Sequence, residues 1–124
     1  MSRAAFFTTL LAVGLASMGV AGYQQAQQKP VVRDIQKVRD NLYFISGGDT
    51  TDRPTWTGGN TAVFVTAKGV VLVDTMLPGN GTSILQRVKS VTGKPVIMVI
   101  NTHTHFDHSG SNNELPATVE FVAH

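Results

Sequence analysis

Residues 102–110 read Thr-His-Thr-His-Phe-Asp-His-Ser-Gly, and this stretch decides how the chain folds and what it can bind. It comes directly after Val96–Ile100, a short apolar run rich in β-branched residues and preceded by Pro95. Such a run predicts a strand that is buried on both faces. We therefore expect the polar side chains of residues 102–110 to lie at the carboxyl end of a central strand.

Three histidines and one aspartate in this stretch are candidate metal ligands. In extended backbone alternate side chains share a face, so His103, His105 and Asp107 are expected to point the same way before the chain turns at His108. Imidazole and carboxylate suit zinc, and the absence of cysteine disfavours a structural zinc site built on thiolates. His103 and His105 with a further protein ligand would hold one ion, while Asp107 and His108 could hold a second. The alternative is a polar turn with incidental histidines.

With these four residues the sequence resembles the metallo-β-lactamase superfamily, whose signature is His-x-His-x-Asp-His. The resemblance extends upstream through Gly58-Gly59-Asn60 and a strand that ends in Asp74, and it covers residues 31–124. It implies an α/β fold, namely the N-terminal half of an αββα sandwich in which two sheets lie between helices.

The resemblance implies a zinc-dependent hydrolase that attacks a small-molecule ester, lactam or thioester through a metal-bound hydroxide. Two Zn²⁺ ions would be present in the complete enzyme, the first held by His103 and His105 and the second by Asp107 and His108. Asp107 would also orient the hydroxide, which makes it the candidate catalytic residue. Asp74 would support the ligand loop from behind, because a ligating imidazole needs its other nitrogen held. A turn-capping role for Asp74 stays open.

The family's later ligands would fall beyond residue 124, so we expect a truncated form that is inactive alone. After His108 the further strong ligand types are Glu114, Glu120 and His124, and His124 could approach the site from a strand end. A sheet meant to pack on a second sheet exposes an apolar face, which leaves self-association open. Two other hypotheses are a non-catalytic zinc-binding half-domain that needs a partner chain, and a relic without function.

Composition and the N-terminus bound the remaining possibilities. The chain has 124 residues, 42% hydrophobic and 15% charged, which is typical of one globular domain. Ten scattered Lys and Arg residues against eight acids do not favour a nucleic-acid partner. Residues 1–22 contain Arg3 and a long apolar run and predict a signal peptide, hence a secreted or periplasmic protein with no membrane contact after cleavage. An uncleaved membrane anchor is the alternative. Residues 23–30 read as a linker, and residues 31–124 as the partial domain.

Local patterns predict the elements between the linker and the ligand motif. The expected strands are residues 31–38, 42–45, 61–66, 70–73, 96–100 and 118–123, of which the first four form two hairpins. The second hairpin turns at Gly69, where we expect positive φ. Thr82 or Ser83 is expected to cap a helix that Gly93 ends, which gives a parallel strand–helix–strand crossover.

The loop of residues 50–59 carries the only tryptophan of the chain, Trp56. An aromatic in such a loop either packs onto the core, the favoured interpretation, or lines a substrate pocket near the metals.

Overall fold

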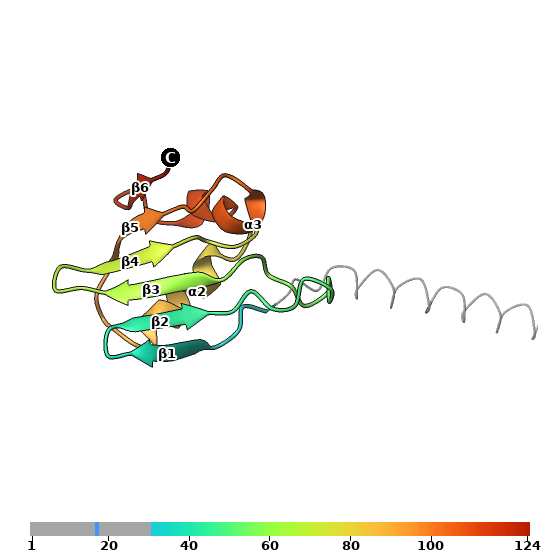
Figure 1. Ribbon diagram of the computed structural model, residues 1–124, viewed down its shortest axis with the longest axis horizontal. Coiled ribbons are helices and arrows are strands. Elements are labelled where there is room, and N and C mark those ends of the chain that lie inside the picture. Colours follow the sequence, from blue (N-terminus) through green and yellow to red (C-terminus); the bar gives the residue numbers. More distant parts are fainter. Residues whose placement is uncertain (1–16, 18–30) are drawn as a thin grey trace, which may run out of the picture.

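The computed structural model describes residue 17 and residues 31–124 (Figure 1). Apart from residue 17, the predicted signal peptide (residues 1–22) and linker (residues 23–30) lie outside the described part. Within the described residues, no helix has the length and apolar character needed to cross a membrane.

One mixed sheet of six strands forms the body of the fold, with the strands side by side in chain order (Figure 1). Strands β1 to β4 are antiparallel to their neighbours, and β4, β5 and β6 run parallel. The elements are β1 (Ile35–Arg39), β2 (Leu42–Ile45), β3 (Thr61–Val65), β4 (Val70–Val73), α2 (Gly81–Lys89), β5 (Val96–Ile100), α3 (Phe106–Ser109), the 3-10 helix η1 (Asn112–Glu114) and β6 (Glu120–Val122).

Both predicted hairpins and the parallel crossover from β4 through α2 to β5 are confirmed. The first strand is shorter than expected and begins at Ile35, where pairing with Ile45 starts. The last strand is also shorter, since β6 pairs with β5 only from Glu120 to Val122.

The core lies between one face of the sheet and α2, which Figure 1 shows behind the strands. Ile84 and Val88 of α2 are buried there, as the apolar spacing of the helix predicts. The buried apolar side chains are Val32, Ile45, Val63, Val70, Leu72, Met76, Ile84, Val88, Val96, Val99, Leu115 and Val119.

The opposite face of the sheet is apolar over its central strands, and no described element covers it in Figure 1. Strand register aligns two rows of side chains across this face. Their apolar parts are Leu42, Phe64, Val71 and Met98, and Phe44, Ala62, Val73, Ile100 and Val122, and the rows continue into Glu120 and Gln36 on the outer strands. Phe64 is 42% exposed and Ile100 is 38% exposed. The expectation that the strand of residues 96–100 is buried on both faces is therefore wrong: it is buried on one.

The helix begins earlier and ends earlier than the sequence predicted. Asn80 is the N-cap of α2 without a side-chain capping bond, so the prediction of Thr82 or Ser83 is wrong. The Glu114 carboxylate instead accepts the backbone N–H groups of Gly79 and Gly81, which satisfies the start of the helix from another element. At the other end, the chain leaves the helix after Lys89, well before the Gly93 that was expected to end it.

The second hairpin uses Gly69 for its size rather than for positive φ, which corrects the prediction made for this turn. A Cβ on Gly69 would lie 2.6 Å from Cγ2 of Ile97 and 2.9 Å from the carbonyl oxygen of Pro95. The close approach of the turn to the start of β5 is what requires glycine.

Candidate metal centre

The ligand motif bends sooner than expected after β5. His105 is the extended N-cap of α3, with φ −64° and ψ 145°, and Asp107 already lies inside this short helix. The carbonyl of His105 accepts the N–H groups of both His108 and Ser109 at 3.0 Å. The prediction of an extended run up to Asp107 is therefore wrong, because one helical turn satisfies these backbone groups.

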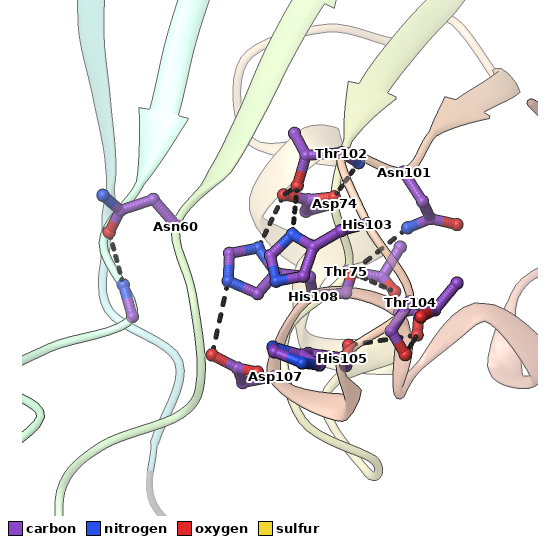
Figure 2. Close-up of polar contacts among 12 residues, drawn as sticks. Asn60, Asp74, Thr75, Asn101, Thr102, His103, Thr104, His105, Asp107 and His108 are labelled. Atoms are coloured by element: carbon purple, nitrogen blue, oxygen red, sulfur yellow. Dashed lines mark hydrogen bonds and ion pairs between the residues drawn. The ribbon is translucent and has the colours of Figure 1, made fainter. Parts of the chain in front are cut away.

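The helical turn nevertheless gathers the four predicted ligands. The ring centroids of His103 and His105 are 4.7 Å apart, and those of His103 and His108 are 4.1 Å apart. Asp107 Oδ2 lies 3.3 Å from Nε2 of His108. In Figure 2 the three rings lie together, with Asp74 and Asp107 at opposite ends of the His108 ring.

This cluster is not a closed metal cage. Among residue 17 and residues 31–124, no group of three or more His, Cys, Asp or Glu side chains is arranged to hold a metal ion. Glu114, one of the further ligand candidates, is occupied at the start of α2, and His124 is exposed at the end of the chain. The described residues thus supply neighbouring donors, but not a complete coordination sphere.

Asp74, which closes β4, lies behind the cluster with its side chain buried. Thr102 donates its N–H to Oδ1 at 2.8 Å and its hydroxyl to Oδ2 at 2.7 Å, while Nδ1 of His108 lies 2.7 Å from Oδ2. Burial raises the pKa of Asp74, but the hydrogen bonds from His108 and Thr102 lower it by more, so the pKa of this carboxyl is below its ordinary value.

The charge of Asp74 decides the tautomer of His108. An ionised carboxylate only accepts hydrogen bonds, so Nδ1 of His108 carries a hydrogen and Nε2 is turned toward Asp107. Neighbouring strands explain the contact: Val73 pairs with Ile100, so the residues that follow each strand meet at one edge of the sheet.

The segment after β4 adopts unusual backbone conformations. Asp74 has φ 64° and Met76 has φ 62°, in the left-handed region that non-glycine residues rarely occupy. Thr75 N–H donates to the carbonyl of His108 at 2.7 Å, and the Met76 carbonyl accepts the Gly110 N–H at 3.0 Å. These backbone conformations are therefore held by bonds to the C-terminal end of α3, and such conformations cluster at functional sites.

A glycine pair completes the support of the ligand helix. Gly59 donates its N–H to the carbonyl of Asp107 at 2.7 Å. Gly58 has φ +121°, and a Cβ there would lie 2.6 Å from the backbone nitrogen of Leu77. The sequence indicated Gly58 and Gly59 only through the family resemblance, and it gave no signal for the role of Thr102.

Trp56 lies outside the core cluster and is half-buried, so the favoured expectation of packing onto the core is not met. The guanidinium carbon of Arg53 lies 4.9 Å from its ring centroid, a cation–π contact within the loop.

One pair of donor atoms can be compared with the geometry of a zinc site. Two ligands of a tetrahedral ion with bonds of about 2.0 Å are separated by about 3.3 Å. Asp107 Oδ2 and His108 Nε2 have this separation of 3.3 Å, and a buried carboxylate holds the other imidazole nitrogen, as is usual for metal-bound histidine.

Residues 54–124 match the family model described as the metallo-beta-lactamase superfamily. A type 2 metallo-beta-lactamase of Elizabethkingia meningoseptica is 33% identical over 102 residues, which is 82% of this chain and 39% of that protein. A probable metallo-hydrolase of Streptococcus pyogenes is 42% identical over 52 residues, 41% of this chain and 21% of that protein. This chain therefore spans about two fifths or less of the length of these relatives.

Solved structures share the fold. The metallo-beta-lactamase FIM-1 of Pseudomonas aeruginosa, solved in a mono-zinc form, superposes with a TM-score of 0.61 at 19% identity, over 78% of this chain and 44% of that one. BJP-1, a subclass B3 enzyme of Bradyrhizobium japonicum, gives 0.52 at 26% identity, over 72% and 31%.

Proposed function

Because this chain belongs to the metallo-beta-lactamase superfamily, we propose that its residues form the first half of the active site of a secreted, zinc-dependent hydrolase. The substrate class is a small-molecule ester, lactam or thioester. His103 and His105 hold one Zn²⁺, Asp107 and His108 hold a second, and residues beyond those described complete both coordination spheres.

One observation supports the proposal most directly: the imidazole of His108 lies between two carboxylates. Its Nδ1 donates to Asp74 at 2.7 Å, which leaves Nε2, 3.3 Å from the Asp107 carboxylate, as the ring nitrogen that can share a cation with that carboxylate. Zn²⁺ suits this position because imidazole nitrogen and carboxylate oxygen are among its usual ligands.

When bound, zinc supplies a nucleophile at neutral pH by lowering the pKa of a bound water. The residues of this chain orient the reaction. Asp74 holds the ring of His108, and Asp107 presents its carboxylate where it can accept a proton or a hydrogen bond from an attacking water. No side-chain nucleophile is needed, so Ser109, whose hydroxyl donates to the carbonyl of His105 at 3.1 Å, has a structural place only.

The proposal is tested by elemental analysis of the purified chain, together with hydrolysis of chromogenic lactam, ester and thioester substrates. We expect the purified chain to contain zinc. His103→Ala and Asp107→Ala are expected to lose this zinc, and His124→Ala, at an exposed residue, is expected to retain it. Hydrolysis is expected only when a protein segment that supplies the remaining metal ligands is also present. Metal content that does not differ between Asp107→Ala and His124→Ala would refute the proposed ligand set.

A second candidate function is a zinc-binding half-domain that is not catalytic alone and is completed by a partner chain. The two apolar rows on the uncovered face of the sheet favour it, since Phe64 and Ile100 are both exposed there. Self-association through this face is the simplest form of such pairing. Light scattering distinguishes the two functions: the half-domain forms a defined dimer with zinc but without hydrolysis, whereas a monomer excludes this pairing.

A further inference from the structure

A closed set of hydrogen bonds holds the backbone carbonyl of His108. Thr75 donates its hydroxyl to Oδ1 of Asn112 at 2.7 Å, and Asn112 donates its amide to Oδ1 of Asn101, also at 2.7 Å. Asn101 then donates its own amide to the carbonyl of His108 at 3.2 Å. The Thr75 N–H closes the ring by donating to the same carbonyl at 2.7 Å.

The side-chain bonds run in one direction, from the Thr75 hydroxyl to the His108 carbonyl. The Thr75 hydroxyl also lies 3.3 Å from the His108 carbonyl, but its single hydrogen goes to the closer Asn112 oxygen. Each amide in turn accepts through its oxygen and donates through its nitrogen, so the orientations of both asparagines are fixed. Hydrogen bonds in such a chain polarise and strengthen one another.

The members come from three separate places in the fold. Thr75 follows β4 and is fully buried, Asn101 follows β5 and is 8% exposed, and Asn112 opens η1 beyond the ligand helix. Figure 2 shows Asn101 and Thr75 on the side of His108 away from Asp107. Thr75 and Asn101 therefore both donate to one carbonyl that belongs to a proposed metal ligand, and Asn112 links the two donors.

We propose that Asn112 is a positioning residue for His108, which acts through Asn101 and does not contact the imidazole. Asp74 fixes the rotation of the imidazole. The closed set of hydrogen bonds fixes the position of the His108 backbone from which the imidazole extends. Both are needed to keep Nε2 at 3.3 Å from Asp107. The inference rests on the proposed function, in which Asp107 and His108 share an ion.

The test compares Asn112→Ala with Asn113→Ala, which removes the neighbouring, exposed asparagine of the same short helix. Long-range proton–nitrogen NMR of the metal-free protein measures the chemical shifts of the His108 imidazole. Hydrogen exchange measures the protection of the Thr75 amide. We expect Asn112→Ala to shift the His108 signals and to speed exchange at Thr75 about tenfold. The signals of His103 are expected to stay in place, and Asn113→Ala is expected to resemble the unmodified chain.

A second pair separates positioning from general loss of stability. Thr75→Val removes the hydroxyl, whereas Thr75→Ser retains it, so only the valine variant is expected to displace His108. In zinc titrations against a chromophoric chelator, Asn112→Ala and Thr75→Val should each weaken the zinc affinity by about 10-fold to 100-fold. Thr75→Ser should keep the zinc affinity of the unmodified chain.

The two proposals fail in different ways. If the unmodified chain binds no zinc, the proposed function is wrong, while the metal-free NMR comparison still decides the positioning role. If Asn112→Ala and Asn113→Ala give the same His108 signals, the positioning role is wrong even in a chain that binds zinc.

Discussion

Gly59 lies directly against the imidazole of His108: a Cβ built on this glycine would be 2.6 Å from Cε1 and 2.9 Å from both ring nitrogens. The two positions are 49 apart in the sequence, and no local pattern indicates this contact. The ring of a proposed metal ligand thus occupies the volume that any other residue at position 59 would fill.

Replacing Gly59 by alanine is expected to push the His108 ring away from Asp107. The added methyl group meets ring atoms well inside van der Waals contact, and overpacking of this kind costs about 1–3 kcal/mol. NMR signals of the His108 ring and the denaturant midpoint measure the two effects. The matched control is Gly93→Ala, where a Cβ meets no atom within 4 Å. Unchanged His108 signals in Gly59→Ala would contradict the prediction.

Replacing Asp74 by asparagine is expected to release the tautomer of His108. The amide keeps the shape of the side chain but removes the negative charge. It also replaces one of the carboxylate oxygens that accept hydrogen bonds from His108 and Thr102. We expect a mixture of Nδ1–H and Nε2–H tautomers by nitrogen NMR, and zinc affinity lowered by about 10-fold to 100-fold. Asp40→Asn, at an exposed turn, serves as the control and leaves both measurements unchanged. A single Nδ1–H tautomer in Asp74→Asn would show that the carboxylate is dispensable.

Replacing Glu114 by glutamine is expected to destabilise α2 without altering the ligand cluster. The carboxylate accepts N–H groups at the positive end of the helix, and loss of such a cap costs about 1 kcal/mol. Urea denaturation followed by circular dichroism measures the loss. Glu120→Gln, an exposed change in β6, is the comparison and should leave the midpoint unchanged. Equal midpoints for the two variants would rule out the capping role.

The uncovered face of the sheet gives a prediction about association. Phe64 lies on this face, whereas Phe121 aligns with Val99 on the opposite side, and the two phenylalanines are 42% and 44% exposed. Phe64→Ser is therefore expected to lower the apparent mass at a given protein concentration, and Phe121→Ser is not. Light scattering over a concentration series measures both variants. The same change in both would point to general stickiness instead of a defined face.

The sequence predicted most of the elements because their signals are local. Short apolar runs marked β2, β3 and β4, and the spacing of Ile84 and Val88 marked the buried side of α2. Errors arose where another part of the chain intervenes. The start of α2 depends on Glu114, more than thirty residues further on, and Gly69 is required by the proximity of Ile97.

The sequence alone predicts the candidate ligands, His103, His105, Asp107 and His108, because residue types and spacing carry that chemistry. Their arrangement was decided by tertiary structure. Parallel pairing of β4 with β5 brings Asp74 to His108 across 34 residues. Other contacts that position His108 involve Gly59 and the hydrogen bonds through Asn112. They join segments whose local sequence patterns do not predict the contacts between them. A ligand can be recognised from its own chemistry, but its position depends on bonds made by residues distant in the chain.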